Sequence, residues 1–392
     1  MMKFAQRTNW TLKENKLTQR LRRLRQSGEP ILDLTESNPT RCGFAYPERK
    51  ILSALGCPAD LSYVPNPKGL LQAREAVCRY YARRQVSVEP EQVFLTSSTS
   101  EAYSFLFRLL ADPNERVLFP RPSYPLFDFL GGLNDLTVDY YPLIYDDGWR
   151  PDFEKFRTAL DKPARALVLV NPNNPTGSFV KEADFLFLNA LAVQKQVPII
   201  SDEVFVDYVF NKKTAGFSLI QGHDNLIFTL GGLSKALALP QMKISWILVN
   251  GPSRLVKKAS ARLEVIADTY LSVSTPVQNS LSRWLDLQPG IQKAVLTRVR
   301  SNRKKLMEGL EGMSGCRYLK ADGGWNAVLR LPSSCREEAF VLDLLEKDHV
   351  LVYPGYFFDF AEESHVVISL LPAENVFQPA LERLKIRVHA WV

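Results

Sequence analysis

The chain predicts an α/β protein with a large, mainly parallel sheet covered by helices and a second, smaller α+β domain. Its 392 residues exceed what one small core holds, which favours two domains. From about residue 93, short runs that are apolar on both faces alternate with helical stretches, as strands of a covered parallel sheet do. After about residue 276 the pattern changes to a long helical tract followed by shorter strands and helices.

The N-terminal segment predicts a basic amphipathic helix. Thr11 to Glu14 follow the capping-box pattern, and the helix is expected to run to about residue 25. Four arginines cluster on it: Arg20, Arg22, Arg23 and Arg25. A solvated helix face explains this cluster better than contact with nucleic acid or membrane, because no aromatic interleaving or recognised nucleic-acid motif accompanies it.

Six short apolar runs are expected to form the strands of the large sheet. They are residues 93–96, 116–119, 166–170, 197–201, 226–230 and 244–249. Helical patterns lie between several of them, including 100–110 and 181–195. This alternation predicts parallel strands joined by covering helices.

The C-terminal part predicts the smaller domain. Residues 327–331, 350–353 and 366–370 resemble strands, and 336–348 and 375–387 resemble helices. The N-terminal segment is expected to join them, since chain ends tend to meet. The expected division is therefore residues 41–279 for the large domain, and 1–40 with 280–392 for the small one.

Charge and cysteine usage limit the partners and the location. The net charge of +7 is modest, and there is no secretory leader pattern and no apolar run of membrane-spanning length. The five cysteines are widely spaced without a CxxC pair, and the four histidines stand apart. We expect reduced thiols in a cytoplasmic protein that binds no metal, no nucleic acid and no membrane.

Asp202 directly follows the apolar run 197–201, and in open α/β sheets ligands bind beyond the carboxyl ends of strands. A carboxylate there could hold the ring nitrogen of pyridoxal phosphate (PLP) protonated, which makes the ring an electron sink. At about 4 Å and an effective dielectric near 20, such a pair is worth about 4 kcal/mol. That energy corresponds to roughly three pKa units. An aspartate capping a turn is the alternative.

Two further residues complete the outline of a PLP site in chain order. Asn174 lies in a loop fixed by Pro172, Pro175 and Gly177, so its amide could donate rigidly to the ring oxygen. Lys235 could bind the aldehyde, which requires a deprotonated amine in a cationic or desolvated pocket. Taken alone, the segment around Asn174 could be an ordinary turn, and Lys235 could be a surface lysine.

Hydroxyl groups between a strand and a helix predict a phosphate site. Ser97, Ser98 and Thr99 are placed where the free amides of a helix start would hold a dianion. A plain serine or threonine N-cap is the alternative. Lys243 could be a further phosphate ligand or a strand-flanking charge, and Tyr124 could stack on the pyridine ring or be a loop aromatic.

The ordered set of motifs resembles the PLP-dependent aminotransferases of fold type I, the aspartate aminotransferase superfamily of classes I and II. The resemblance extends from Ile31 to the C-terminal helix and includes Tyr63-Val64-Pro65, the segment from Pro122 to Leu126, and Ile368-Ser369. It implies a sheet of the seven-stranded type and homodimers whose active sites are shared between subunits.

By resemblance, specific roles fall on specific residues. Lys235 matches the Schiff-base lysine that also shuttles the proton, with Asp202 at the pyridinium and Asn174 at the ring oxygen. The implied cofactor-binding residues are Ser97, Ser98, Thr99, Tyr124, Ser234 and Lys243. Tyr63 matches a tyrosine that reaches the phosphate of the partner subunit.

The chain departs from the family pattern at four positions. Phe205 stands where a tyrosine usually contacts the ring oxygen, Lys243 replaces an arginine, and Gly232 replaces a serine or threonine. Val367 stands where the family places the arginine that binds the substrate carboxylate. An unpaired buried carboxylate costs several kcal/mol. Either another cation binds it, or the substrate has no carboxylate there.

Candidate substrate residues follow from this last departure. Arg41, in the loop that begins at Asn38, is the candidate replacement cation, with a surface arginine as the alternative. Trp325 and Phe357-Phe358 resemble positions that form an apolar substrate pocket, although core packing explains them equally well.

The sequence thus predicts a PLP-dependent aminotransferase that moves an amino group from an amino-acid-like donor to a keto acceptor in a ping-pong cycle. A PLP-dependent C–S β-lyase or decarboxylase is the alternative, since the same fold supports several reactions. A regulatory protein on this scaffold is disfavoured, because regulators of this kind carry a DNA-binding domain for which the segment before Ile31 is too short.

Overall fold

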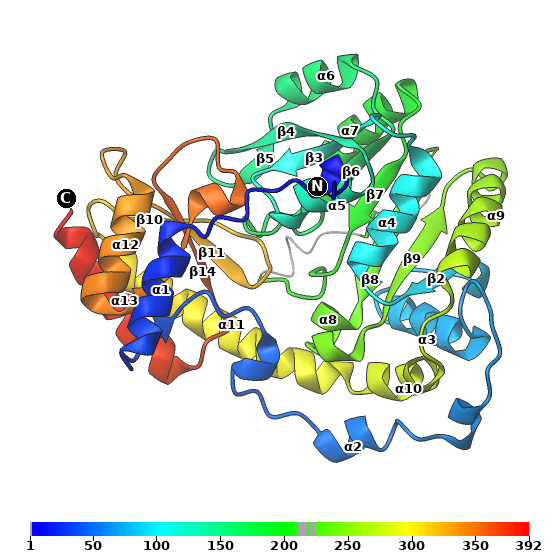
Figure 1. Ribbon diagram of the computed structural model, residues 1–392, viewed down its shortest axis with the longest axis horizontal. Helices are drawn as coiled ribbons and strands as arrows, with labels where there is room; N and C mark the ends of the chain where they lie inside the picture. The colour runs from blue at the N-terminus through cyan, green and yellow to red at the C-terminus, as the bar shows by residue number, and fades with distance from the viewer. Residues whose placement is uncertain (1, 211–217, 220–223, 392) are drawn as a thin grey trace.

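The computed structural model describes residues 2–210, 218–219 and 224–391. A large sheet with its helices occupies one side of the molecule, and a smaller sheet with α1, α12 and α13 occupies the other (Figure 1). The long helix α11 (Gln288–Leu310) extends from α10 (Thr275–Asp286) to the small sheet.

Eight strands form the large sheet within the described ranges. In spatial order they are β2 (Val93–Thr96), β9 (Ser245–Asn250), β8 (Ile227–Gly232), β7 (Ile199–Asp202), β6 (Ala166–Val170), β3 (Arg116–Arg121), β4 (Thr137–Tyr145) and β5 (Trp149–Pro151). From β8 to β4 the neighbours are parallel, whereas β9 is antiparallel to both β8 and β2, and β5 is antiparallel to β4. The mainly parallel sheet is confirmed, and β5 adds an edge strand to the expected seven.

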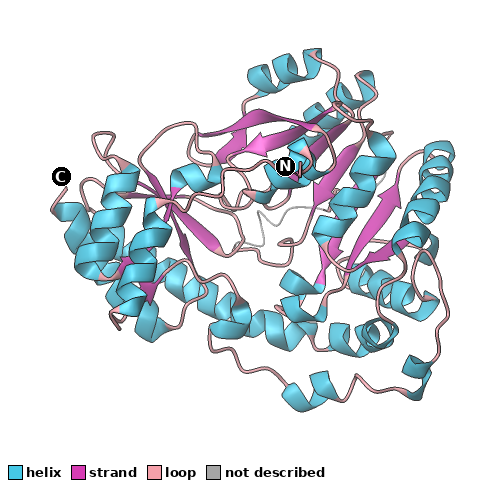
Figure 2. Ribbon diagram, in the orientation of Figure 1, coloured by secondary structure: helices cyan, strands magenta, loops and turns pink. Residues whose placement is uncertain are grey.

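Helices cover both faces of this sheet, which explains why its central strands are apolar throughout (Figure 2). The helices over one face are α4 (Thr99–Leu110), α5 (Leu126–Leu133) and α9 (Ser253–Tyr270). Those over the other are α6 (Phe153–Asp161) and α7 (Glu182–Gln194). Near β2 and β9 lie α2 (Glu48–Leu52), α3 (Leu71–Ala82), α8 (Leu233–Ala236) and α10.

The smaller sheet is antiparallel. Its four strands, in order, are β10 (Arg317–Leu319), β11 (Asn326–Arg330), β14 (His365–Ser369) and β13 (Tyr353–Pro354). Helices α12 (Glu337–Asp348) and α13 (Glu374–His389) pack with these strands in one apolar core.

The N-terminal segment joins this C-terminal part of the chain. Helix α1 (Lys16–Gln26) packs against α12, and β1 (Leu32–Asp33) pairs in parallel with β12 (Val350–Leu351). Helix α11 contacts both parts of the molecule, so no single point in the chain separates them sharply. The expected domain limits, 1–40 with 280–392 against 41–279, therefore remain a prediction.

The start of the first helix differs from the expectation. The capping box at Thr11 does not open it, because the helix begins at Lys16 and Asn15 is its N-cap. The Oδ1 atom of Asn15 accepts a hydrogen bond of 2.8 Å from the backbone N–H of Thr18. Asparagine is as good an N-cap as serine or threonine, so local pattern alone did not separate the two candidates.

Short 3-10 helices occupy several connections: η1 (Gln6–Thr8), η2 (Pro39–Arg41), η3 (Pro58–Leu61), η4 (Pro90–Gln92), η6 (Pro240–Met242) and η7 (Gly355–Phe358). No helix in the described part of the chain combines the length and the apolar character that crossing a bilayer requires.

Candidate active site

A cavity of about 320 Å³ lies where the carboxyl ends of β6 and β7 meet the start of α4, helix α8 and the small sheet. Seven predicted site residues line it: Thr99, Tyr124, Asn174, Asp202, Ser234, Lys235 and Trp325. Six do not line it: Asn38, Arg41, Tyr63, Ser97, Ser98 and Lys243. The core of the predicted site is thus brought together from segments distant in the sequence.

Asp202 ends β7 with its carboxylate held inside the cavity wall. Its Oδ2 accepts a hydrogen bond of 3.0 Å from the hydroxyl of Tyr103, and its Oδ1 accepts one of 3.2 Å from the backbone N–H of Val204. Burial raises the pKa of Asp202 to about 6, although these hydrogen bonds and the nearby Lys235 lower it. At neutral pH the group is therefore a buried, oriented anion that needs a cationic partner.

Lys235 lies in α8 and faces the same cavity. Burial lowers its pKa to about 8, while the Asp202 carboxylate acts in the opposite direction. The Nζ atom lies 5.1 Å from the centroid of the Phe205 ring and 4.8 Å from that of Trp325. The Tyr208 hydroxyl donates to the backbone carbonyl of Lys235 over 2.6 Å. An anchored lysine with a lowered pKa is available as a nucleophile near neutral pH.

Asn174 presents its amide in a fixed orientation. Its Oδ1 atom accepts a hydrogen bond of 2.7 Å from Nδ2 of Asn326, at the start of β11. Because the oxygen is engaged, the Nδ2 group of Asn174 remains as the donor for a ligand. Phe205 lines the cavity as well and cannot donate.

The residues of the serine-rich turn have two different roles: some cap the start of α4, and others line the cavity. Oγ of Ser98 accepts from the backbone N–H of Glu101 over 3.1 Å, and the Glu101 carboxylate accepts from the N–H of Ser97 over 2.6 Å. The first bond makes Ser98 the N-cap of α4, and the second ties the Glu101 side chain to the residue before the cap. Thr99 and Ser100, which follow, line the cavity instead. The helix start and these two hydroxyls together form an anion-binding arrangement.

Lys243, Arg41 and Asn38 lie away from the cavity. Lys243 is exposed and follows η6 in the left-handed conformation, with a φ of 48°. The Arg41 side chain is 75% exposed and comes only within 4.0 Å of Glu36. Oδ1 of Asn38 accepts from the N–H of Thr40 over 3.1 Å and thereby caps η2.

The position of the family's carboxylate arginine is filled by apolar packing. Val367 is fully buried in β14 and packs in an apolar cluster with Trp149, Leu319, Val328 and Phe358. Tyr353, Phe357 and Phe358 line the cavity next to this cluster. This wall is therefore apolar, as the sequence predicted for Phe357 and Phe358.

Sequence reasoning missed Tyr103, Asn326 and Ser245. Tyr103 is one helical turn beyond the serine-rich segment, and Asn326 directly follows Trp325, so proximity to predicted residues was the only available signal. Ser245 lines the cavity because β9 pairs with β8 opposite Gly232, which only the strand register reveals. No cluster of three or more histidine, cysteine, aspartate or glutamate residues suited to a metal occurs among the described residues.

The fold and the cavity define an α/β protein with a buried lysine and a buried carboxylate in one cavity, and comparison with known proteins identifies the family. Residues 47–384 match the family described as Aminotransferase class I and II, whose members use pyridoxal phosphate. The chain belongs to this family. It is an aminotransferase that acts on small-molecule substrates.

Curated relatives match most of the chain, and a solved structure has the same fold. The chain is 26% identical over 370 residues to a glutamate-pyruvate aminotransferase, AlaA, of Haemophilus influenzae, covering 92% of this chain and 91% of that one. It is 28% identical over 374 residues to an alanine aminotransferase of Mycobacterium tuberculosis, covering 92% and 86%. An alanine aminotransferase structure from Pyrococcus furiosus superposes with a TM-score of 0.90 at 22% identity, over 99% of this chain and 100% of that one.

Proposed function

We propose that this aminotransferase binds PLP in the cavity described above and uses Lys235 as the residue that both holds the cofactor and moves the proton. The observation that carries the proposal is the convergence of three groups in one cavity: an amine with a pKa of about 8, a buried carboxylate and an oriented amide. These groups match the aldehyde, the ring nitrogen and the ring oxygen of PLP, respectively.

The residues present fit the whole cofactor. Hydroxyls of Thr99, Ser100 and Ser234 line the cavity beside the start of α4, which suits a phosphate dianion. Tyr124 lines the cavity with an aromatic ring available for stacking. The buried Asp202 carboxylate lacks a strong cationic partner other than Lys235 among the groups that set its pKa, and a pyridinium supplies one.

Each residue then has a defined task. Bound PLP draws electrons away from the carbon that carries the substrate's amino group, so a proton on that carbon becomes removable. Once the amino donor has displaced it from the cofactor's aldehyde carbon, Lys235 would accept that proton at Nζ and return it to that carbon, because a pKa of about 8 leaves part of the amine neutral near neutral pH. Asp202 keeps the ring nitrogen charged, and Asn174 donates to the ring oxygen. The aromatic rings of Phe205 and Trp325 lie beside Nζ, with their centroids 5.1 and 4.8 Å from it.

At least one of the amino donors is expected to have an apolar side chain, because part of the cavity wall is apolar. The names of the relatives make alanine and glutamate the first donors to test, with pyruvate as an acceptor. The apolar wall at Val367 cannot bind a carboxylate, and Arg41 lies outside the cavity, so the donor's carboxylate is not held by the family's usual arginine. Ser37 and Tyr353 also line the cavity, and their hydroxyls are polar groups to which no other task has been assigned.

A donor screen tests the proposal. Purified enzyme with PLP is mixed with single amino donors, and the visible absorbance of the bound cofactor is followed without an acceptor. Alanine or glutamate is expected to convert the cofactor to its amine form, and pyruvate or 2-oxoglutarate to restore it. Release of pyruvate and ammonia from a β-substituted donor without an acceptor would instead show elimination. Lack of spectral change with every donor would contradict the proposal.

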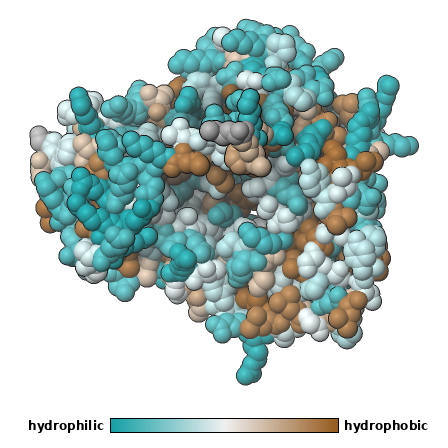
Figure 3. Space-filling view, viewed as in Figure 1, coloured by the Kyte–Doolittle hydropathy of each residue, from teal (hydrophilic) through white to brown (hydrophobic). Residues whose placement is uncertain are grey.

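We also propose a homodimer in which Tyr63 reaches the partner's phosphate site. Leu61, Tyr63 and Val64 are 93%, 70% and 62% exposed in a segment that follows α2 along the outer edge of the chain (Figure 1). Hydrophobic surface gathers at the lower right of this face (Figure 3). Exposed large side chains in one segment are typical of an interface.

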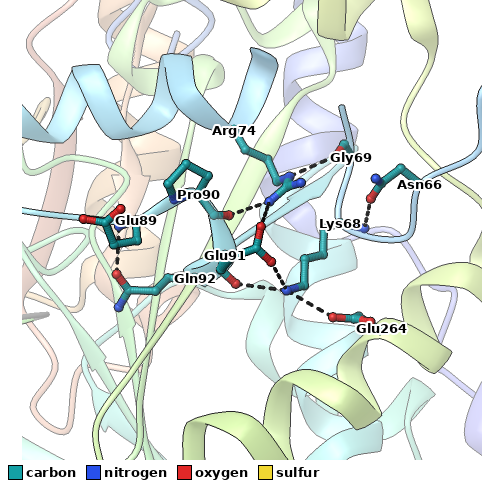
Figure 4. Close-up of polar contacts among 9 residues, drawn as sticks. All are labelled: Asn66, Lys68, Gly69, Arg74, Glu89, Pro90, Glu91, Gln92 and Glu264. Carbon is teal, nitrogen blue, oxygen red and sulfur yellow. Dashed lines mark hydrogen bonds and ion pairs between the residues drawn. The ribbon is translucent and has the colours of Figure 1, made fainter. Parts of the chain in front are cut away.

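The segment with Tyr63 is anchored where it returns to the large sheet (Figure 4). Lys68 Nζ lies 2.9 Å from the Glu91 carboxylate and 3.1 Å from that of Glu264. Nη1 of Arg74 lies 3.2 Å from Glu91, and its Nε donates to the carbonyl of Gly69 over 3.0 Å. These contacts fix the end of the segment while Tyr63 projects outward.

Mixing two inactive chains tests the shared site. Tyr63→Ala and Lys235→Ala chains, unfolded and refolded together, are expected to regain activity, because one site of the mixed dimer then has both residues. Light scattering must also show twice the mass of one chain. A monomer at micromolar concentration, or no recovery in the refolded mixture, would overturn the dimer proposal.

A further inference from the structure

Gly232 and Ser245 face each other on neighbouring strands. The side chain of Ser245 occupies the space that a side chain on residue 232 would need. The register of β8 and β9 pairs these two residues directly. A Cβ atom added to Gly232 would lie 2.3 Å from Oγ of Ser245 and 3.0 Å from its Cβ. The backbone of Gly232 is extended, with a φ of 175°, so the limit on its side chain is this contact rather than backbone strain.

The Ser245 hydroxyl is placed to meet a ligand. The residue is 2% exposed and lines the cavity next to Gly232, Ser234 and Lys235. Its Oγ makes no hydrogen bond with any residue in the described part of the chain. A buried hydroxyl without a protein partner is costly unless a ligand or water satisfies it.

The phosphate site also lacks the charge that the family pattern supplies. Lys243, at the position of the usual arginine, is exposed and does not line the cavity. Neutral donors must therefore contribute more of the phosphate binding in this chain. Those on the cavity wall are the hydroxyls of Thr99, Ser100, Ser234 and Ser245.

We propose that Ser245 donates a hydrogen bond to the phosphate of PLP and so replaces the hydroxyl that residue 232 supplies elsewhere in the family. This inference rests on the proposed binding of PLP. It assigns a phosphate ligand to β9, opposite the strand that leads to Lys235.

Binding measurements on Ser245→Ala test the inference. The dissociation constant is measured by absorbance titration for PLP and for pyridoxal, which has the aldehyde and ring but no phosphate. A hydrogen bond to a charged group predicts about 10-fold to 100-fold weaker binding of PLP. Binding of pyridoxal is expected to change less than about twofold, because its contacts do not include Ser245.

A reciprocal exchange separates the hydroxyl's role from packing. Gly232→Ser is expected to fit poorly in the wild-type background, because of the 2.3 Å contact with Oγ of Ser245. In the double variant Gly232→Ser/Ser245→Gly that oxygen is gone and the hydroxyl has moved across the strand pair. The double variant is expected to bind PLP more tightly than Ser245→Gly alone.

Thr229→Val is the matched control. Thr229 is a buried hydroxyl residue of β8 without a partner among the described residues, and it does not line the cavity. Its variant is expected to bind PLP like the wild type. Thermal unfolding of the cofactor-free proteins confirms that all variants are folded.

Three outcomes would overturn the inference. Unchanged PLP binding in Ser245→Ala excludes a phosphate contact. Equal weakening of PLP and pyridoxal shows a structural role for Ser245. A wild-type chain that binds neither compound overturns the proposed function and this inference with it, whereas the first two outcomes leave the proposed function intact.

Discussion

Replacing Asn326 with leucine should weaken the hydrogen bond that Asn174 donates to the ring oxygen, although Asn174 itself is unchanged. The Nδ2 group of Asn326 holds Oδ1 of Asn174 at 2.7 Å, so the amide of Asn174 can present only its nitrogen to the cofactor. Leucine has a similar volume and no donor. Asn174 then loses the constraint that orients it, and Phe205 offers no substitute donor nearby.

The magnitude follows from one lost hydrogen bond. A neutral hydrogen bond contributes about 1 kcal/mol net, and leaving its acceptor unpaired adds to that cost. For the partly buried Asn174 we expect about 1 to 1.5 kcal/mol in total, which is roughly a 5-fold to 12-fold lower kcat/KM. The same energy should raise the titration midpoint of the bound cofactor by about one pH unit, because the anionic ring oxygen loses a donor.

The assay is a pH titration of the visible absorbance of the bound cofactor, with kcat/KM measured on the same preparations. Phe205→Tyr is the matched variant, because it adds a donor and should lower the midpoint. In the double variant the added hydroxyl should recover part of the effect of Asn326→Leu. An unchanged midpoint and an unchanged kcat/KM in Asn326→Leu would refute the role given to Asn326.

Three further predictions concern single groups of the site. With a pKa of about 8, Lys235 is mostly protonated at pH 6 and mostly neutral at pH 9, so the rate of cofactor attachment should rise with pH, with a midpoint near pH 8, and level off above about pH 9. Stopped-flow absorbance measures this rate, and a rise that continues beyond pH 10 would show an unshifted lysine. Asp202→Asn can keep the hydrogen bond from the Val204 N–H at its amide oxygen, whereas its Nδ2 group would donate to the Tyr103 hydroxyl instead of accepting from it. The variant loses the charge, and a loss of about 4 kcal/mol predicts roughly a thousandfold lower kcat in a stably folded enzyme. A decrease of less than tenfold in steady-state assays would contradict the role of the charge. Arg41→Ala should leave the KM for alanine and glutamate unchanged, because Arg41 is 75% exposed and outside the cavity; a tenfold higher KM would place it in the substrate site.

The sequence predicted those parts of the structure that depend on local pattern. Strands such as β6 are buried on both faces, so their residues are apolar without interruption and were readily recognised. Asp202 could be placed in the site because parallel strands end at one edge of a sheet. Strand β4 was missed because its residues are mostly half-buried, which leaves neither a continuous apolar run nor a clean alternation.

Contacts between distant segments could not be read from the sequence. The hydrogen bond from Asn326 to Asn174 joins residues 152 positions apart. The pairing of Ser245 with Gly232 depends on strand register, which a shift of one residue would change. The exposure of Arg41 and Lys243 likewise depends on the paths of their loops, so their proposed roles could not be judged beforehand.

The central claim is that Lys235 binds the cofactor's aldehyde covalently, and reductive trapping tests it most directly. The enzyme is incubated with PLP, reduced with borohydride, digested and mapped by mass spectrometry. We predict a single pyridoxyl adduct on the peptide that contains Lys235, and its absence in Lys235→Ala. An adduct on another lysine of the wild-type enzyme, or no adduct at all, would contradict the account.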